Sequence, residues 1–260
     1  MVDASQAGSG QPVSLSVAGA EARACELLKK TDDLVRDFIM NHPFTQRLEE
    51  QSLPIEAIRA ANLDWYVFHR EMAASFSRLY KRFVNICRTH VVIEEEYLER
   101  ISHELTRPKA GGRTLLLRKL LLALDVPEAK INEPSRSVDL RGLVAYFGRL
   151  HSEGTFAEVV AGQIGSALEP YARLWRDALT RQCGLGAEAV QYWEMNCRLG
   201  QDKDGGGALG TRQENALLLR QAFEHGLTET RFNWSMEYAA EMAVKVWALM
   251  LRGYVRRFKL

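Results

Sequence analysis

Two pairs of side chains in this sequence have residue types and spacing that suit metal binding or proton transfer. Glu96 and His103 stand seven residues apart, which is two helical turns, so both would point the same way. His225 and Glu229 are four residues apart and would share one helical face. Imidazole and carboxylate together suit iron or manganese, and open coordination positions would admit dioxygen. These four residues form the candidate metal-ligand set.

The segment 212–260 would position the second pair. Apolar residues recur there every three or four positions, which predicts one long helix. On that helix His225, Glu229, Phe232 and Met236, spaced i, i+4, i+7 and i+11, would share a stripe that is otherwise apolar. A buried histidine and carboxylate need partners, because an unpaired polar group costs several kcal/mol on burial. Those partners would be protein, metal or ligand.

Helical patterning continues through the rest of the chain, and strand-like alternation does not occur. Further helices are predicted at residues 18–41, 54–87, 89–106, 113–125, 139–152, 155–183 and 187–198. Residues 202–207 (DKDGGG) are predicted to be a linker and residues 1–17 to have little fixed structure. We therefore expect residues 18–260 to form one all-α domain, a bundle of roughly seven to nine helices.

Composition excludes several classes of protein. The 34 basic and 33 acidic residues give a net charge of +1, which leaves no basic excess for a phosphate backbone, so nucleic-acid binding is not expected. No apolar run reaches the roughly 18 residues of a membrane span, and no signal peptide is visible. The four cysteines are far apart and lack a CxxC pair, which predicts reduced thiols and a cytoplasmic location.

Three segments, in order, resemble the heme-oxygenase-like superfamily, in particular its pyrroloquinoline-quinone synthase (PqqC) and TenA-like branch. They are Asn41-His42-Pro43-Phe44, Ser166-Ala167-Leu168-Glu169-Pro170-Tyr171 and Glu224-His225-Gly226-Leu227. The resemblance implies a heme-oxygenase-like helical bundle, a small-molecule substrate inside it, and a homodimer. Members of the superfamily include cofactorless oxidases, dimetal oxidases and oxygenases, and thiamin-degrading hydrolases, so the fold does not decide the reaction.

The dimetal oxidases of the superfamily share a ligand pattern that this sequence matches only in part. Glu96 and His103 match its early Glu-x6-His, and His225 and Glu229 match the start of its late His-x3-Asp/Glu-x2-His. The last late position is Phe232, which cannot bind a metal. Aligning Pro170 with the family proline places Ser166 and Arg173 where a glutamate and a histidine are expected. A cofactor is therefore either absent or non-heme iron.

A metal-free site would use a different set of groups. The candidate catalytic residues are His103, His225 and Tyr171, and the candidate substrate-binding residues are Arg173, Ser166 and Tyr66. Arginine gives bidentate contacts to a carboxylate, and histidine transfers protons near neutral pH. The aromatic cluster that includes Tyr66 is otherwise typical of core packing.

The sequence departs from the motifs of individual branches of the superfamily. Thr45 stands where the quinone synthases have a second histidine, and no cysteine lies near Pro170 as TenA hydrolysis would require. The order Glu237-Tyr238 reverses the Tyr-Glu pair of that branch. The leading hypothesis is a biosynthetic oxidase or oxygenase acting on a small amino-acid-derived or aromatic substrate with dioxygen. The alternatives are a non-catalytic binding or assembly protein and a TenA-type hydrolase.

Overall fold

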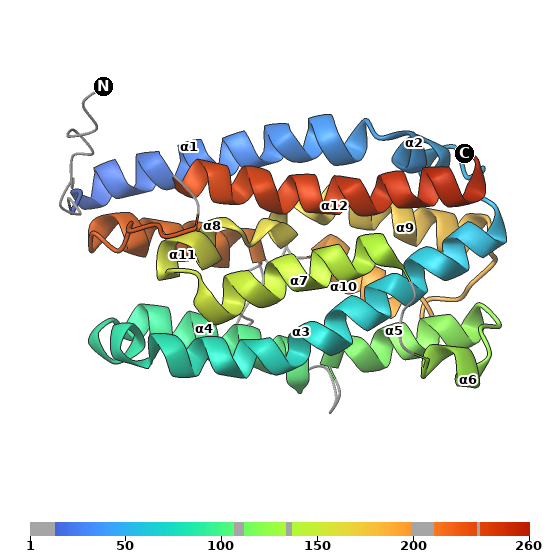
Figure 1. Ribbon diagram of the computed structural model, residues 1–260, viewed down its shortest axis with the longest axis horizontal. Helices are drawn as coiled ribbons and strands as arrows, with labels where there is room; N and C mark the ends of the chain where they lie inside the picture. The colour runs from blue at the N-terminus through green and yellow to red at the C-terminus, as the bar shows by residue number, and fades with distance from the viewer. Residues whose placement is uncertain (1–13, 107–111, 134–136, 199–210, 233–234) are drawn as a thin grey trace, which may run out of the picture.

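The computed structural model describes residues 14–106, 112–133, 137–198, 211–232 and 235–260. Every regular element within these ranges is helical, so the all-α prediction is confirmed. The long helices run roughly along the longest axis of the molecule (Figure 1). Predicted features within residues 1–13 and the predicted linker at 202–207 lie outside the described residues.

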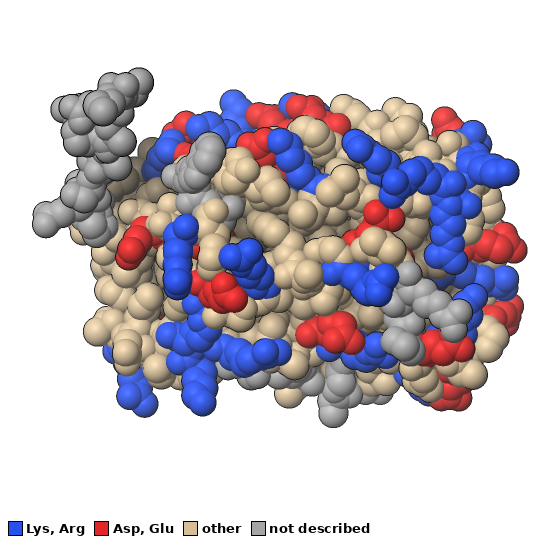
Figure 2. Space-filling model, viewed as in Figure 1, with Lys and Arg blue, Asp and Glu red and all other residues tan. Residues whose placement is uncertain are grey.

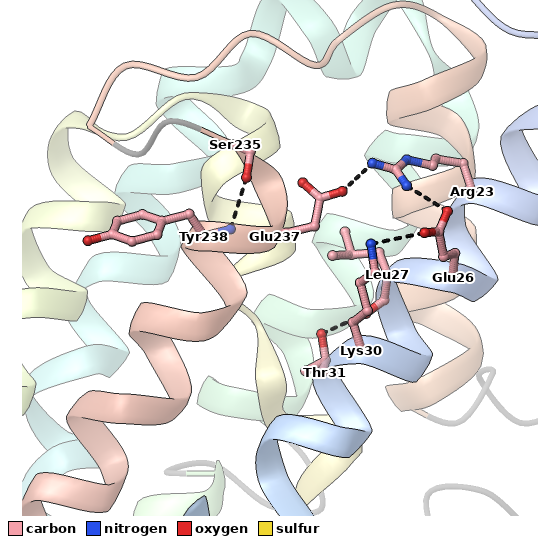
Figure 3. A network of polar contacts seen from close by, with 8 residues as sticks. All are labelled: Arg23, Glu26, Leu27, Lys30, Thr31, Ser235, Glu237 and Tyr238. Carbon is pink, nitrogen blue, oxygen red and sulfur yellow. Dashed lines mark hydrogen bonds and ion pairs between the residues drawn. The ribbon is translucent and has the colours of Figure 1, made fainter. Parts of the chain in front are cut away.

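Helices α1 (Val17–Val35) and α12 (Met236–Phe258) lie side by side (Figure 1). Each begins at a serine whose hydroxyl accepts a backbone N–H of the first turn, Ser16 from Gly19 and Ser235 from Tyr238. Figure 3 shows how a guanidinium links the two helices: Arg23 of α1 contacts both Glu26 of its own helix and Glu237 of α12. These groups are partly exposed, so the ion pairs mainly fix how the two helices align.

Helix α1 continues as a π-helical segment (Arg36–Met40), and the chain then turns into the short helix α2 (Pro43–Glu49). Pro43 occupies the first turn of α2, where its missing N–H costs nothing. The Nδ1 atom of His42 caps this helix by accepting from the backbone N–H of Phe44 at 3.3 Å. The His-Pro-Phe segment is thus a helix start.

Helix α3 (Ile55–Thr89) is the longest element, and the helices that follow pack along it. Its partners are α4 (Val91–Leu105), α5 (Gly112–Ala123) and α7 (Val138–Glu153), with α6 (Glu128–Ile131) beside α5. The chain reverses between α3 and α4 at His90, whose backbone leaves the helical region (φ −133°, ψ 87°). Helix α7 also packs on α12, so it lies between the two long helices (Figure 1).

The single helix predicted for residues 155–183 is wrong. The chain forms α8 (Phe156–Ala161), a 3-10 segment (Ile164–Leu168) and α9 (Glu169–Arg181), followed by α10 (Gln191–Arg198). Gly162 follows the last residue of α8, and a larger residue is disfavoured there because a Cβ atom would come within 2.7 Å of the Leu150 side chain. Pro170 lies in the first turn of α9, so it begins a helix instead of lying inside one.

The long C-terminal helix predicted for residues 212–260 is also wrong. Helix α11 (Thr211–Glu224) ends before His225, and α12 begins only at Met236. Gly226 has a positive φ of 67°, a conformation that glycine adopts readily. The stripe predicted to run from His225 to Met236 therefore does not exist.

A buried glutamate explains why the chain leaves the helical path here. Glu158 of α8 is fully buried, and its carboxylate accepts the backbone N–H groups of Arg231 and Phe232. It also accepts the N–H of Thr155, with which it forms a capping box. The Thr155 hydroxyl donates to the carbonyl of Glu229 at 2.6 Å. These bonds hold residues 229–232 against the start of α8.

The face in Figure 2 carries both basic and acidic side chains, and the basic ones cover more of it. Among the described residues, no helix combines the length and apolar character that a bilayer crossing requires.

Candidate ligand-binding site

The middle of α3 presents an aromatic stripe to the interior. The stripe consists of Trp65, Phe68, His69, Met72 and Phe76, spaced i, i+3, i+4, i+7 and i+11. These side chains form one wall of a cavity of about 160 Å³. The remaining walls come from α5, which contributes Arg113, and from α7, the 162–168 segment, α9, α10, α11 and α12. An apolar cavity of about this size holds a single aromatic ring, and drug-sized ligands need several hundred Å³.

The aromatic rings of the cavity are packed in fixed orientations. Trp247 of α12 stacks on Trp65 with centroids 4.5 Å apart and contacts Phe68 edge-on at 5.0 Å. Trp193 of α10 meets Trp65 edge-on at 5.3 Å. Packing on both sides holds these rings rigidly, and flat π faces favour a planar ligand.

A hydrogen-bonded pair of buried side chains joins α3 to α10 at this cavity. The Nε2 atom of His69 lies 2.7 Å from the Tyr192 hydroxyl, and both residues line the cavity. His69 is also stacked against Trp65, with centroids 5.8 Å apart. Stacking on Trp65 and the contact with Tyr192 therefore fix the orientation of the His69 ring, and proton transfer requires a group of fixed orientation.

A second histidine, His151, lines the cavity from the last turn of α7. Its Nδ1 atom lies 2.7 Å from the hydroxyl of Ser75 on α3. Arg82, also on α3, donates to the backbone carbonyls of His151 and Gly154 at 2.5 and 2.6 Å. A cation at the C-terminal end of α7 complements the helix dipole there.

Helix α11 contributes a buried carboxylate and amide. Glu214 and Asn215 are each only 2% exposed, and both line the cavity. Asn215 donates its side-chain N–H to the backbone carbonyl of Gln163 at 2.6 Å, which ties α11 to the 162–168 segment. A carboxylate in such a position is suited to accept N–H groups of a ligand.

Tyr171 of α9, predicted to be catalytic, does line the cavity and is 3% exposed. Its hydroxyl has no hydrogen-bond partner of normal geometry among the described residues. Burial raises the pKa of Tyr171 well above that of an ordinary tyrosine, an effect that the neighbouring Trp175 only partly offsets. Tyr171 is therefore a neutral donor at the cavity wall.

The other predicted residues of known position lie elsewhere. His225 is exposed; it stacks on His90 with centroids 4.0 Å apart and contacts the Gln221 amide at 3.1 Å. Arg173 faces solvent and pairs with Glu169 on its own helix. Tyr66 is buried beneath Arg70 and is not part of the cavity wall. His103 falls within α4 and Ser166 within the 3-10 segment, but their side chains lie outside the described part of the structure.

The three candidate metal ligands whose side chains the structure describes, Glu96, His225 and Glu229, do not form a group. Glu96 is half-buried on α4, whereas His225 and Glu229 are exposed and lie outside any helix. Within the described ranges, no three histidine, cysteine, aspartate or glutamate side chains are grouped as a metal site would require. The described side chains thus do not fit the dimetal centre of the oxidase pattern, and we derive no step through a metal.

The spacing of residues in the sequence indicates one part of this site, the α3 stripe. The α3 stripe has the helical spacing that singled out residues 225–236, and it includes a histidine among aromatic residues. From the sequence alone, its aromatic residues are typical of core packing. His151, Tyr192 and Glu214 lie on three other helices, and no spacing along the chain links them to the stripe. Only the tertiary fold brings them to one cavity.

Comparisons with known proteins identify the architecture. No family model and no curated protein matches the chain. Among solved structures, a TenA family transcription regulator from Silicibacter sp. TM1040 is similar over 93% of this chain and 98% of that chain, with a TM-score of 0.50 and 12% sequence identity. At this identity the similarity concerns the fold alone. The bundle therefore has the TenA and heme-oxygenase-like architecture that the three sequence segments predicted.

Proposed function

We propose that this chain binds a small, single-ring aromatic or heteroaromatic molecule in its interior cavity and hydrolyses it by general acid–base catalysis. This is a TenA-type hydrolase in scaffold and in reaction class, and it uses no oxidant. The observation that carries the proposal is the cavity itself: about 160 Å³, walled by fixed aromatic rings, with two histidines and a glutamate among the residues lining it.

The nature of the nucleophile follows from the cysteines. None of the four lines the cavity, and burial raises the pKa of both Cys87 and Cys197 to about 11, which disfavours the thiolate. Water is therefore the proposed nucleophile. A cavity histidine takes a proton from it as the oxygen attacks, and the leaving group departs with a proton supplied by the same or the second histidine. The Tyr171 hydroxyl donates to a polar atom of the bound ring.

The cavity's size and lining also define the ligand class. A tetrapyrrole does not fit in about 160 Å³, whereas a pyrimidine, imidazole or pyridine ring does. Glu214 and Asn215 at one wall favour a ring that carries N–H or amino groups. A nitrogen heterocycle with an exocyclic substituent, cleaved at that substituent, meets both requirements.

Ligand binding is testable through the tryptophans of the cavity wall. A panel of substituted pyrimidines, imidazoles and pyridines, with thiamin included, should contain compounds that quench intrinsic fluorescence at micromolar to millimolar concentration. Tyr171→Phe should weaken binding of those compounds about fivefold or more, because the orphan hydroxyl would be lost. Tyr66→Phe is the matched control, since Tyr66 is buried but lies off the cavity, and should bind as wild type.

Turnover separates the candidate reactions. Compounds that bind should be hydrolysed equally well with and without oxygen, as followed by mass spectrometry, and His69→Gln should reduce the rate at least a hundredfold. Turnover only in air, with oxygen consumed, would favour the oxidase hypothesis. Binding without any turnover would favour a non-catalytic binding protein, a reading supported by the engagement of both histidines with protein hydroxyls.

A further inference from the structure

We infer that Ser75 is a positioning residue: it holds His151 in the tautomer protonated at Nδ1, so that the Nε2 atom is the basic nitrogen of the neutral ring. The inference deepens the proposed function, because it assigns His151 as the residue that takes a proton from the attacking water.

The Ser75 hydroxyl has a single proton to donate. This oxygen has two close polar neighbours, the backbone carbonyl of Met72 and the Nδ1 atom of His151, each at 2.7 Å. A carbonyl oxygen can only accept, so the hydroxyl donates to Met72. The Met72 sulfur, at 3.9 Å, is a weak acceptor and does not compete. The lone pairs of the serine oxygen then remain for Nδ1, which must therefore donate.

A neutral imidazole has one N–H group, so a proton on Nδ1 means that Nε2 carries none. With hydrogen on Nδ1, Nε2 is an acceptor and the site at which the ring takes up a second proton. Free histidine ordinarily prefers the opposite tautomer, with hydrogen on Nε2. The surrounding structure must therefore impose the reversed preference.

Burial makes that preference strong. Ser75 and His151 are each only 4% exposed, so bulk water does not readily replace a lost bond between them. The opposite tautomer would set the lone pair of Nδ1 against those of the serine oxygen at 2.7 Å. Loss of one buried hydrogen bond changes such an equilibrium roughly ten- to a hundredfold.

Helix α3 holds His151 at two points. Ser75 contacts its ring, and Arg82, seven residues further along the same helix, donates to its backbone carbonyl at 2.5 Å. Residues seven apart lie on one helical face, so side chain and main chain are fixed from one rigid surface. The Nε2 atom of His69, by contrast, lies 2.7 Å from the Tyr192 hydroxyl, which can either donate or accept. The same reasoning therefore does not fix its tautomer, which makes it an internal control.

The tautomer can be measured directly by ¹⁵N NMR on the wild-type chain labelled at histidine, at a pH where the rings are neutral. We expect a pyrrole-type shift for Nδ1 and a pyridine-type shift for Nε2 of His151. In Ser75→Ala the two shifts should move towards each other or exchange, and Ser75→Thr, which keeps a hydroxyl, should restore the wild-type pattern. Tyr192→Phe is the control and should change the shifts of His69 but not those of His151.

Two results would overturn the inference: a wild-type His151 with hydrogen on Nε2, or identical His151 shifts in wild type and Ser75→Ala. Because the wild-type measurement needs no variant, a misfolded Ser75→Ala protein would not prevent the test. The measurement also needs no substrate, so failure of the proposed hydrolysis and failure of this assignment are distinguishable. With a substrate in hand, Ser75→Ala should lower kcat ten- to a hundredfold and leave KM within about threefold.

Discussion

Replacing Glu158 by alanine is expected to cost about 4–6 kcal/mol of unfolding free energy, although the residue does not line the cavity. Its carboxylate is 0% exposed and accepts three backbone N–H groups, those of Thr155, Arg231 and Phe232. One of them belongs to the start of α8, and two belong to a segment more than 70 positions later. The side chain therefore joins two distant parts of the chain.

The magnitude follows from those three bonds. A hydrogen bond to a charged group contributes about 1.5–3 kcal/mol, so three would sum to roughly 4–9 kcal/mol if water could not reach the donors. Arg231 is exposed and Phe232 half-buried, so water can partly solvate their N–H groups after truncation, and the lower part of that range applies. Glu158→Gln keeps one acceptor oxygen but sets an amide N–H₂ against a backbone donor, and should cost about 2–3 kcal/mol.

Equilibrium urea unfolding, followed by circular dichroism and tryptophan fluorescence, measures both losses. Glu153→Gln is the matched control: its carboxylate is exposed and pairs with Arg149 at 3.5 Å, so its loss should change stability by about 0.5 kcal/mol or less. Equal effects of Glu158→Gln and Glu153→Gln would refute the reasoning. Hydrogen exchange offers a local check, because the amides of Arg231 and Phe232 should lose protection in Glu158→Gln.

Two further predictions concern titratable groups. Burial lowers the pKa of His42, and the positive charge of Arg252 lowers it further. As pH falls below about 6.5, His42 therefore binds a proton in the unfolded chain before it does so in the folded chain. Thermal stability should therefore decrease as pH falls below that value, and His42→Asn, which keeps a capping side chain, should make the decrease shallower; an unchanged slope would contradict this. Burial raises the pKa of Cys87 and Cys197 to about 11, so at pH 8 a thiol reagent should modify exposed Cys25 first and these two only on unfolding. Rapid labelling of either buried thiol in the native protein would show that its burial is transient.

Local patterns predicted the helices well where each helix has its own start and stop signals. Pro54 and His90 bound α3 close to the predicted range of 54–87, and Ser137 caps α7 where a helix was predicted. The failures have a common cause. The chain between α11 and α12 retains apolar periodicity, but the carboxylate of Glu158 binds two of its backbone N–H groups. A contact between residues so distant in sequence cannot be predicted from the spacing of apolar residues.

The site was predictable only in part for the same reason. Tyr171 belongs to a segment that resembles a known family and lines the cavity, and its catalytic role stays a prediction. His225 was selected for a helical stripe that the turn at Gly226 abolishes. His69 lies on a genuine stripe, but aromatic neighbours at helical spacing are usually core residues, so the pattern alone could not distinguish a cavity wall from packed interior.

The 162–168 segment and α3 both line the cavity, but they differ in how well they should tolerate substitutions that change ligand preference. Five residues of the 162–168 segment line the cavity, and its 3-10 turn has no side-chain cap and weaker hydrogen bonds than an α-helix. A Cβ atom added at Gly165 would meet nothing within 4 Å, so that position tolerates larger side chains. Redesign of ligand preference should therefore succeed in this segment. It should fail at Trp65, Phe68 and Phe76 of α3, whose rings contact His69 or His151.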